Sequence, residues 1–150
     1  MATGSSTPNP LLRLDNQVCF ALHSASLAMA KVYRPLLAPL GLTYPQYLVM
    51  LVLWEQEGLT VTEIGERLHS DSGTLTPLLK RLQTQGLLSR ERDAADERRV
   101  LITLTPIGRR LKAKAQDIPA CVVSASGTSV KNLQALGQQV RELRDRLQGR

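Results

Sequence analysis

Residues 60–105 restrict the possible folds of this chain more than any other segment, because they carry the signals of two short helices followed by a β-hairpin. Thr60 and Glu63 have the spacing of a capping box, in which the two residues satisfy each other's backbone amides at a helix start. A second helix is predicted to begin at Asp71 or Ser72, since both residue types are preferred at the N-cap. This arrangement is typical of a helix–turn–helix.

The hairpin completes the module. Gly86 ends the second helix, because glycine readily adopts the left-handed conformation found after helix C-termini. Strands are predicted over residues 87–92 and 100–105, and a polar stretch longer than a tight turn joins them. We therefore predict a winged helix–turn–helix DNA-binding module over residues 58–105. In such a module the second helix enters the major groove and the wing lies against the minor groove.

Two helices are predicted before the module. Apolar residues recur at steps of three and four over residues 11–34, and Pro35 disfavours continuation of that helix. A capping box formed by Thr43 and Gln46 then precedes the apolar run of residues 47–54. A buried strand is the alternative for that run, and the cap favours a helix.

Two more helices are predicted after the module. Thr105 is an N-cap followed by proline at the first helical position, and Pro119 is expected to kink the helix that begins there. The last helix, over residues 130–147, has apolar residues spaced as in a helix-pairing seam. Because a small winged module cannot cover these apolar stripes, residues 11–57 and 106–150 are predicted to form a helical dimerisation region.

The fold class expected is therefore mainly α with a small β-wing. The net charge of +6 does not locate a DNA surface, because it is unevenly placed. Residues 1–57 and residues 58–105 each sum to zero, and residues 106–150 carry the whole excess. Residues 1–10 are rich in Ser, Thr, Pro and Gly and are expected to form a disordered leader.

Composition excludes several classes of protein. The longest wholly apolar run has eight residues, far below the roughly 20 that a membrane helix needs, and the N-terminus lacks the features of a signal peptide. Two cysteines 102 positions apart exclude a disulfide-stapled scaffold and a four-cysteine zinc site. The chain has no P-loop, Gly-x-Ser-x-Gly elbow or Cys-x-x-Cys pair. We expect a cytoplasmic protein without membrane partner, cofactor, metal or enzymatic activity.

Exposed polar side chains of the second helix and the wing form the predicted DNA-reading surface. Hydroxyls near the helix start can approach bases and phosphates, and basic side chains can reach phosphate or guanine. On the wing, Asp96 is expected to orient Arg98 for a narrow minor groove, with Arg90, Arg92 and Arg99 also gathered around it. The alternative is a solvated helix and a salt-bridged hairpin. The predicted DNA-binding residues are Ser72, Thr74, Thr76, Lys80, Arg81, Arg90, Asp96 and Arg98.

Several of these segments resemble the MarR family of transcriptional regulators, and in particular its branch of organic hydroperoxide resistance regulators of the two-cysteine type. The resemblance implies a homodimeric repressor that leaves operator DNA when an organic hydroperoxide oxidises a cysteine. It extends over about residues 11–148. The similar segments are the wing DAADERR (93–99) with LTPIG (104–108), the helix DSGTLTPLLKRLQTQGLL (71–88), LTYPQY (42–47) and DNQVCF (15–20).

Local sequence leaves the reactivity of Cys19 open. A helix N-terminus lowers the pKa of a thiol, Asp15 would oppose that effect, and His23 would assist it only when protonated. The resemblance implies that Cys19 is the redox sensor. It also implies that Tyr33 and Tyr44 donate hydrogen bonds to its thiolate across the dimer interface. Tyr47, by contrast, is predicted to be a core residue.

The resemblance further implies that Cys121 is the resolving cysteine. Its thiol would capture the sulfenic acid of Cys19 on the other subunit as a disulfide, and the resulting helix displacement would move the winged modules. Three alternatives stay open. In the first, the chain is a MarR-type repressor that is released by a small aromatic ligand, and its cysteines are incidental. In the second, it is a thiol peroxidase. In the third, it is a metal sensor in which Cys19 and His23 form half of a metal site and His69 or Cys121 completes it.

Overall fold

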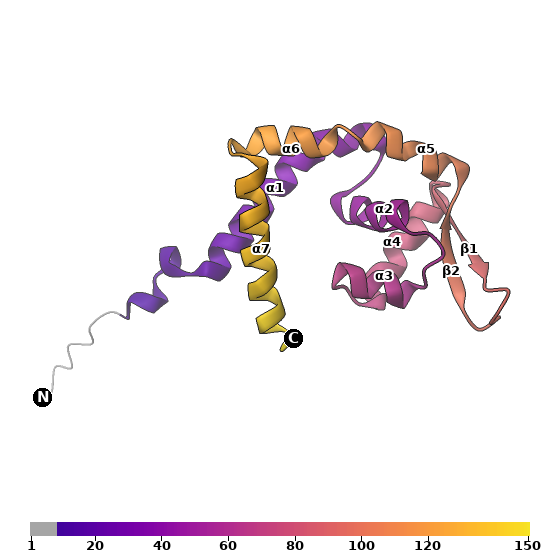
Figure 1. Ribbon diagram of the computed structural model, residues 1–150, viewed down its shortest axis with the longest axis horizontal. Coiled ribbons are helices and arrows are strands. Elements are labelled where there is room, and N and C mark those ends of the chain that lie inside the picture. The colour runs from indigo at the N-terminus through magenta and orange to yellow at the C-terminus, as the bar shows by residue number, and fades with distance from the viewer. Residues whose placement is uncertain (1–8) are drawn as a thin grey trace, which may run out of the picture.

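The computed structural model describes residues 9–150 and is mainly helical, with one two-stranded hairpin, which confirms the predicted fold class (Figure 1). The leader predicted over residues 1–10 lies almost wholly outside the described residues. The elements are η1 (Pro10–Leu12), η2 (Leu14–Asn16), α1 (Val18–Leu37), η3 (Ala38–Leu40), α2 (Tyr44–Glu55), α3 (Val61–Leu68), α4 (Ser72–Thr84), β1 (Leu88–Arg92), β2 (Val100–Leu104), α5 (Pro106–Ala115), α6 (Ile118–Ser126) and α7 (Val130–Leu147).

The predicted helix caps are present. At the start of α3, the Thr60 amide donates to Glu63 Oε2 at 2.7 Å and the Glu63 amide donates to Thr60 Oγ1 at 3.2 Å. The same reciprocal arrangement opens α2, which is therefore a helix and not a strand. Each cap satisfies amides that have no partner inside the helix. The capping residues of α2 to α5 are Thr43, Thr60, Asp71 and Thr105.

The core lies where α2, α3, α4 and the hairpin meet. Val49 and Met50 of α2, Leu79 of α4 and Ile102 of β2 are all 0% exposed. α2 contacts α1 on one side and both α3 and α4 on the other. This helix therefore connects the long N-terminal arm to the winged module.

The first helix begins later than predicted. Residues 11–16 form parts of two 3₁₀ turns, and α1 starts only at Val18. The Asn16 side chain donates to the Pro10 carbonyl at 2.7 Å, and Gln17 Nε2 donates to the Leu11 carbonyl. Such side-chain bonds compete with the helical pattern of backbone bonds. The predicted end was also wrong, because Pro35 lies inside the last turn and α1 continues to Leu37.

A second correction concerns the helix after the wing. The single kinked helix that was expected is two helices, α5 and α6, separated by Gln116 and Asp117. Pro119 is the second residue of α6, a position where its missing N–H costs no helical hydrogen bond. The proline therefore begins a new helix instead of bending an old one.

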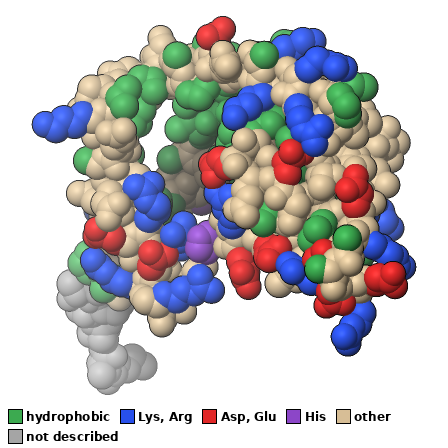
Figure 2. Space-filling model, turned by 45° about the vertical axis from the view of Figure 1, so that its right-hand side comes forward, with side chains coloured by type: hydrophobic (Ala, Val, Ile, Leu, Met, Phe, Trp, Pro, Cys, Tyr) green, Lys and Arg blue, Asp and Glu red, His purple; other side chains and the backbone are tan. Residues whose placement is uncertain are grey.

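Figure 1 shows α5 and α6 along the top edge of the molecule, with α1 rising obliquely to lie beside α6 and α7 descending from the end of α6. Only Leu37 is buried in α1, and α7 has no buried residue. Figure 2 shows an opening between the α7 arm and the winged module, with hydrophobic side chains on its wall. The exposed large apolar residues of the arms are Leu11, Leu12, Leu14, Val18, Phe20, Leu27, Met29, Val130, Leu136 and Leu147.

No single helix within residues 9–150 is long and apolar enough to cross a membrane. The segments 18–40 and 44–55 reach the required hydropathy only as a pair, and the chain bends by 66° between them.

Candidate nucleic-acid interface and thiol site

One face of α4 is exposed at the side of the module away from the core. Leu75, Leu79 and Leu82 of this helix are buried and Leu78 packs against the core, so the exposed face is the opposite, polar one. Ser72 and Thr74 lie in its exposed first turn, where Asp71 accepts the Thr74 amide at 2.7 Å. That amide and the Thr74 hydroxyl hold the pKa of Asp71 below its usual value.

The basic residues of α4 lie further along the same helix. Lys80 and Arg81 are both exposed, and neither forms an ion pair within residues 9–150. Thr76, by contrast, is half-buried and its hydroxyl donates to the Ser72 carbonyl at 2.7 Å. The two cations are therefore available to an anionic partner, and the Thr76 hydroxyl retains only its acceptor capacity.

The wing presents Arg98 at its tip. β1 and β2 pair antiparallel from Leu88 opposite Leu104 to Arg92 opposite Val100, and the connecting loop projects beyond them (Figure 1). Arg98 is 93% exposed in its side chain, and its Nε lies 3.5 Å from Asp96 Oδ1. The same oxygen accepts the Arg98 amide at 3.1 Å. The expected pairing of these two residues is present.

The other arginines of the wing do not gather around Asp96 as expected. Arg99 pairs instead with Glu63 of α3, at 3.2 Å, and with Asp93, at 3.6 Å. Arg92 donates to the Glu97 carbonyl at 2.9 Å. These contacts attach the wing to α3 and link β1 to the loop that follows it.

Arg90 is half-buried on β1, where it lies opposite the fully buried Ile102. Its Nε and NH2 atoms are buried and have no hydrogen-bond partner among the described residues. Because these donors lie inside the module, Arg90 is less able to contact DNA than the other predicted residues.

Cys19 and Cys121 are both exposed free thiols. Cys19 is the second residue of α1, whose first turn has no side-chain cap. Tyr33 lies fourteen residues later in the same uninterrupted helix, which places it about 21 Å farther along the axis at the usual rise per residue. Within one subunit the Tyr33 hydroxyl therefore cannot reach the Cys19 sulfur.

Three tyrosines meet at the other end of α1. The rings of Tyr33 and Tyr44 have centroids 4.7 Å apart, and Tyr47 lies 5.9 Å from Tyr33. Tyr47 is only 3% exposed, which confirms it as a core residue. Burial, with the neighbouring tyrosines, raises the pKa of Tyr33 to about 12, and burial also raises the pKa of Tyr44. Both phenols are thus protonated hydrogen-bond donors at neutral pH.

Cys121 lies in the first turn of α6, and its amide donates to the Asp117 carbonyl at 3.1 Å. α6 contacts α1 directly. No group of three or more His, Cys, Asp or Glu side chains within residues 9–150 is close enough to hold a metal ion.

Comparisons with known proteins identify the family. Residues 31–115 match the family model described as transcriptional regulator SarA/Rot. The organic hydroperoxide resistance transcriptional regulator of Bacillus subtilis (strain 168) is 53% identical over 125 residues, which cover 83% of this chain and 85% of that protein. This chain belongs to the MarR family of transcriptional regulators. The expected resemblance to its organic hydroperoxide resistance branch is confirmed.

A second relative of this MarR-family chain extends the match. The HTH-type transcriptional regulator TtmR of Methylorubrum extorquens (strain PA1) is 51% identical over 148 residues, covering 99% of this chain and 74% of that protein. The structure of reduced AbfR bound to DNA, a protein of Staphylococcus epidermidis, matches with a TM-score of 0.74 at 35% identity, covering 90% of this chain and 94% of the other. Disulfide-formed AbfR matches with a lower TM-score of 0.61, at 37% identity and 91% coverage of both chains.

No pattern in the sequence predicts the contacts that attach α5 of this MarR-family chain to α2, to the loop after α2 and to the end of β2. Trp54 Nε1 donates to the Gly108 carbonyl at 3.0 Å. Glu57 accepts the Leu104 amide at 2.7 Å and the Arg109 guanidinium at 3.0 and 3.2 Å. Burial favours a higher pKa for Glu57, but the Arg109 and Leu104 hydrogen bonds and the Arg109 charge outweigh it and lower the pKa.

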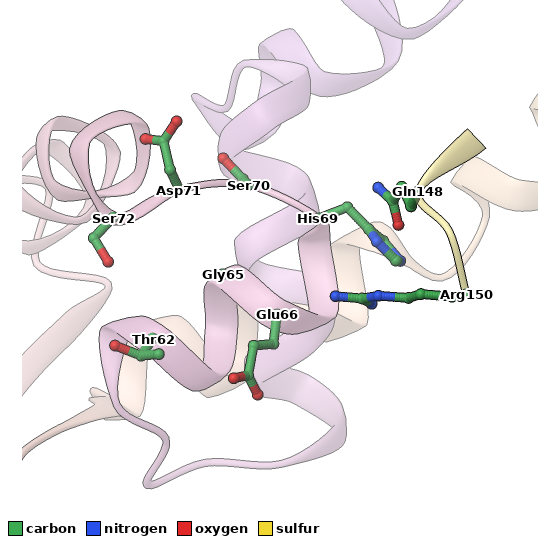
Figure 3. Close-up of a pocket in the computed structure, with 9 residues that line it drawn as sticks. All are labelled: Thr62, Gly65, Glu66, His69, Ser70, Asp71, Ser72, Gln148 and Arg150. Atoms are coloured by element: carbon green, nitrogen blue, oxygen red, sulfur yellow. The ribbon is translucent and has the colours of Figure 1, made fainter. Parts of the chain in front are cut away.

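A polar cavity of about 460 Å³ lies beside the start of α4 (Figure 3). His69 ends α3 in the left-handed conformation, with φ of 53°, and points toward Gln148 and Arg150. Asp71 and Ser72 lie on the other side of the cavity. Its described lining contains no large apolar side chain, so it does not suit the aromatic ligand of the alternative hypothesis.

Proposed function

We propose that this chain is a homodimeric transcriptional repressor that binds operator DNA and releases it when an organic hydroperoxide oxidises Cys19. The observation that carries the proposal is the separation of Cys19 from the tyrosine pair along α1. An exposed thiol at one end of a long helix and protonated phenols at the other end form one site only when two subunits combine.

The exposed apolar arms support the dimer. Leu14 and Val18 near the start of α1 are each 59% exposed, and Leu136 in α7 is 56% exposed. Apolar stripes on helices are normally covered, and a two-fold symmetric partner covers the arms of both subunits at once. Such pairing would bring Cys19 of one subunit toward Tyr33 and Tyr44 of the other.

The redox step would use the thiolate of Cys19 as the nucleophile. Its electron pair attacks the terminal oxygen of the hydroperoxide ROOH, so that an S–O bond forms and the O–O bond breaks. The alkoxide RO⁻ leaves and takes up a proton to become the alcohol ROH, while Cys19 becomes a sulfenic acid. Tyr33 and Tyr44 would donate hydrogen bonds to the thiolate that precedes this step.

Cys121 would resolve the sulfenic acid. Its thiol sulfur attacks the Cys19 sulfur of the partner subunit, an S–S bond forms, and the hydroxyl leaves as water. A disulfide needs Cα atoms roughly 4.4–6.8 Å apart, so α6 and the partner's α1 would have to approach each other. The lower similarity of this chain to disulfide-formed AbfR than to the reduced, DNA-bound form supports a change of shape on oxidation.

DNA binding would use the exposed face of α4 and the tip of the wing. Ser72, Thr74, Lys80 and Arg81 would face the major groove, and Arg98 would enter the minor groove with Asp96 holding its guanidinium. Thr76 and Arg90 complete the proposed set, although the Thr76 hydroxyl can only accept a hydrogen bond and two of the Arg90 donors are buried in the module. The reducing conditions of the cytoplasm would keep both thiols ready for the signal.

A binding titration tests the proposal. An operator is first selected from a random duplex pool with the reduced protein, and its affinity is followed by fluorescence anisotropy. We expect tight binding in reductant and release by one equivalent of cumene hydroperoxide per Cys19. Release that persists in Cys19→Ser protein would show that this thiol is not the sensor.

Two further arms separate the other classes of function. Release by a phenolic compound under reducing conditions, with an unchanged thiol count, would indicate a ligand-responsive repressor. Consumption of many equivalents of hydroperoxide in the presence of a thiol reductant would indicate a peroxidase, since a sensor consumes about one equivalent per site before it must be reduced.

A further inference from the structure

A second, smaller cavity lies next to the tyrosine cluster, between the end of α1 and the start of α2. It has a volume of about 250 Å³, which is room for roughly eight water-sized groups. Leu37 and Leu42, at 1% and 7% exposed, give it an apolar wall, and Tyr44 also lines it. The lining residues are Ala30, Arg34, Leu37, Leu42, Thr43 and Tyr44.

Arg34 is the one charged residue in this lining. It is exposed in the last turn of α1 and forms no ion pair within residues 9–150. A cation at a helix C-terminus is favourable for the helix dipole alone. That role does not require the side chain to line a cavity with an apolar wall and a phenol.

A guanidinium beside an apolar wall is suited to bind an organic anion, which has both a charged group and a hydrocarbon part. Arginine is permanently charged, and its planar fork matches the two oxygens of a carboxylate. The wall of Leu37 and Leu42 would receive the hydrocarbon part of the same molecule. Tyr44 belongs to both the cavity and the proposed thiolate site, so in the proposed dimer a molecule held here would lie beside the partner's thiol.

We propose that Arg34 is a specificity-determining residue that binds the carboxylate of small, carboxylate-bearing organic hydroperoxides, so that these oxidise Cys19 faster than neutral ones do. The inference rests on the proposed function, because the partner subunit must bring Cys19 to the tyrosines. The chemical step is the one given above. The thiolate takes the terminal oxygen, and the carboxylate-bearing alkoxide leaves and is protonated to the alcohol.

The test compares a charged and a neutral hydroperoxide, cumene hydroperoxide carrying a para-carboxylate and the methyl ester of the same compound. The full chain with Cys121→Ser is used, so that Cys19 is the only thiol, and the second-order rate constant of thiol loss is measured in quenched samples. We expect the acid to react about fivefold to tenfold faster than the ester, less than a buried charge-assisted hydrogen bond would give, because the Arg34 side chain is exposed to solvent.

Three variants test whether the difference in rate between the acid and the ester depends on Arg34. Arg34→Gln should bring the acid-to-ester ratio close to one, and Arg34→Lys should retain part of it, since a lysine keeps the charge but loses the fork. Lys31→Gln is the matched control, because Lys31 is an exposed cation of the same helix that does not line the cavity. It should keep the full ratio.

The outcomes separate this inference from the proposed function. A wild-type ratio near one, or a ratio that survives in Arg34→Gln, would overturn the carboxylate subsite while oxidation by the ester still supports Cys19 as sensor. An Arg34→Gln protein that reacts more slowly with both compounds at an unchanged ratio would overturn it too, because Arg34 would then act on the thiol. Failure of both compounds to oxidise Cys19 would overturn both proposals.

Discussion

Glu57 holds Arg109 across 52 positions of sequence, with Arg109 Nε and NH2 lying 3.2 and 3.0 Å from the two carboxylate oxygens. The same carboxylate accepts the Leu104 amide at the end of β2. One side chain thus joins the loop after α2 to the end of the wing and to the first turn of α5. These contacts attach α5, which precedes α6 in the chain, to the end of β2 and to the loop after α2.

Substitution of Glu57 by Gln should destabilise the protein by about 1 kcal/mol, the net value of a typical hydrogen bond, because the amide cannot match both the guanidinium and the Leu104 amide. Chemical denaturation measures the change. Glu55→Gln is the control, as Glu55 is an exposed acid nearby whose one partner is Arg67. Equal losses in the two variants would contradict the role assigned to Glu57.

The same carboxylate predicts a pH effect. Folding lowers the pKa of Glu57 from its ordinary value of 4.5, so its contribution to stability is complete above that value and is lost as the pH falls through the lower folded pKa. Denaturation from pH 7 to pH 3 should therefore show a smaller decline in Glu57→Gln than in the wild type. Parallel curves would show that this group does not contribute.

Gly108 should not tolerate a side chain. A Cβ atom at this position would lie 2.0 Å from the Leu87 carbonyl oxygen, a backbone atom that cannot move aside alone. We expect Gly108→Ala to lose about 3 kcal/mol of stability, the upper end for overpacked sites. Gly137→Ala in α7 is the control, since only the flexible Arg141 side chain lies near, and it should be neutral or slightly stabilising. Thermal unfolding distinguishes the two.

Lys80 should contribute a phosphate contact. Its replacement by Gln should lower the slope of log affinity against log salt by about one unit and weaken binding to all sequences alike. Lys131→Gln, an exposed lysine of α7, should leave the slope unchanged. A slope unaltered in Lys80→Gln would remove this residue from the DNA interface.

The tyrosine pair should accelerate the oxidation of Cys19. Tyr33→Phe and Tyr44→Phe should each slow thiol loss about tenfold, because a charge-assisted hydrogen bond to the thiolate is removed while the ring stays. Tyr47→Phe should change the rate little, since Tyr47 is a core residue. Because the pKa of Tyr33 is about 12, the wild-type rate should not fall between pH 8 and about 10 through loss of this donor.

The sequence predicted the structural features that depend on residues close together in the chain. Thr60 and Glu63 are three positions apart, so their capping box could be recognised and α3 placed correctly. The start of α1 was wrong because Asn16 and Gln17 bond back to carbonyls six residues earlier, an arrangement that apolar periodicity does not report.

Sequence patterns did not predict the contacts between segments that are far apart in the chain. Arg99 was placed near Asp96, three positions away, whereas it pairs with Glu63, 36 positions away on α3. The attachment of Trp54 to Gly108 spans 54 positions and was missed for the same reason. Charge and hydrogen-bonding capacity are visible in a sequence, but the choice among equivalent partners is made only by the packing of the fold.

The unbroken course of α1 has a genetic consequence. If Cys19 and Tyr33 act at opposite ends of one rigid helix, each sensor takes its thiol from one polypeptide and its phenols from the other. A dimer without the thiol then does not respond and a dimer without the phenols responds slowly, yet a mixed dimer of the two contains one complete sensor. Co-expression of the two alleles would restore a fast response that neither possesses alone.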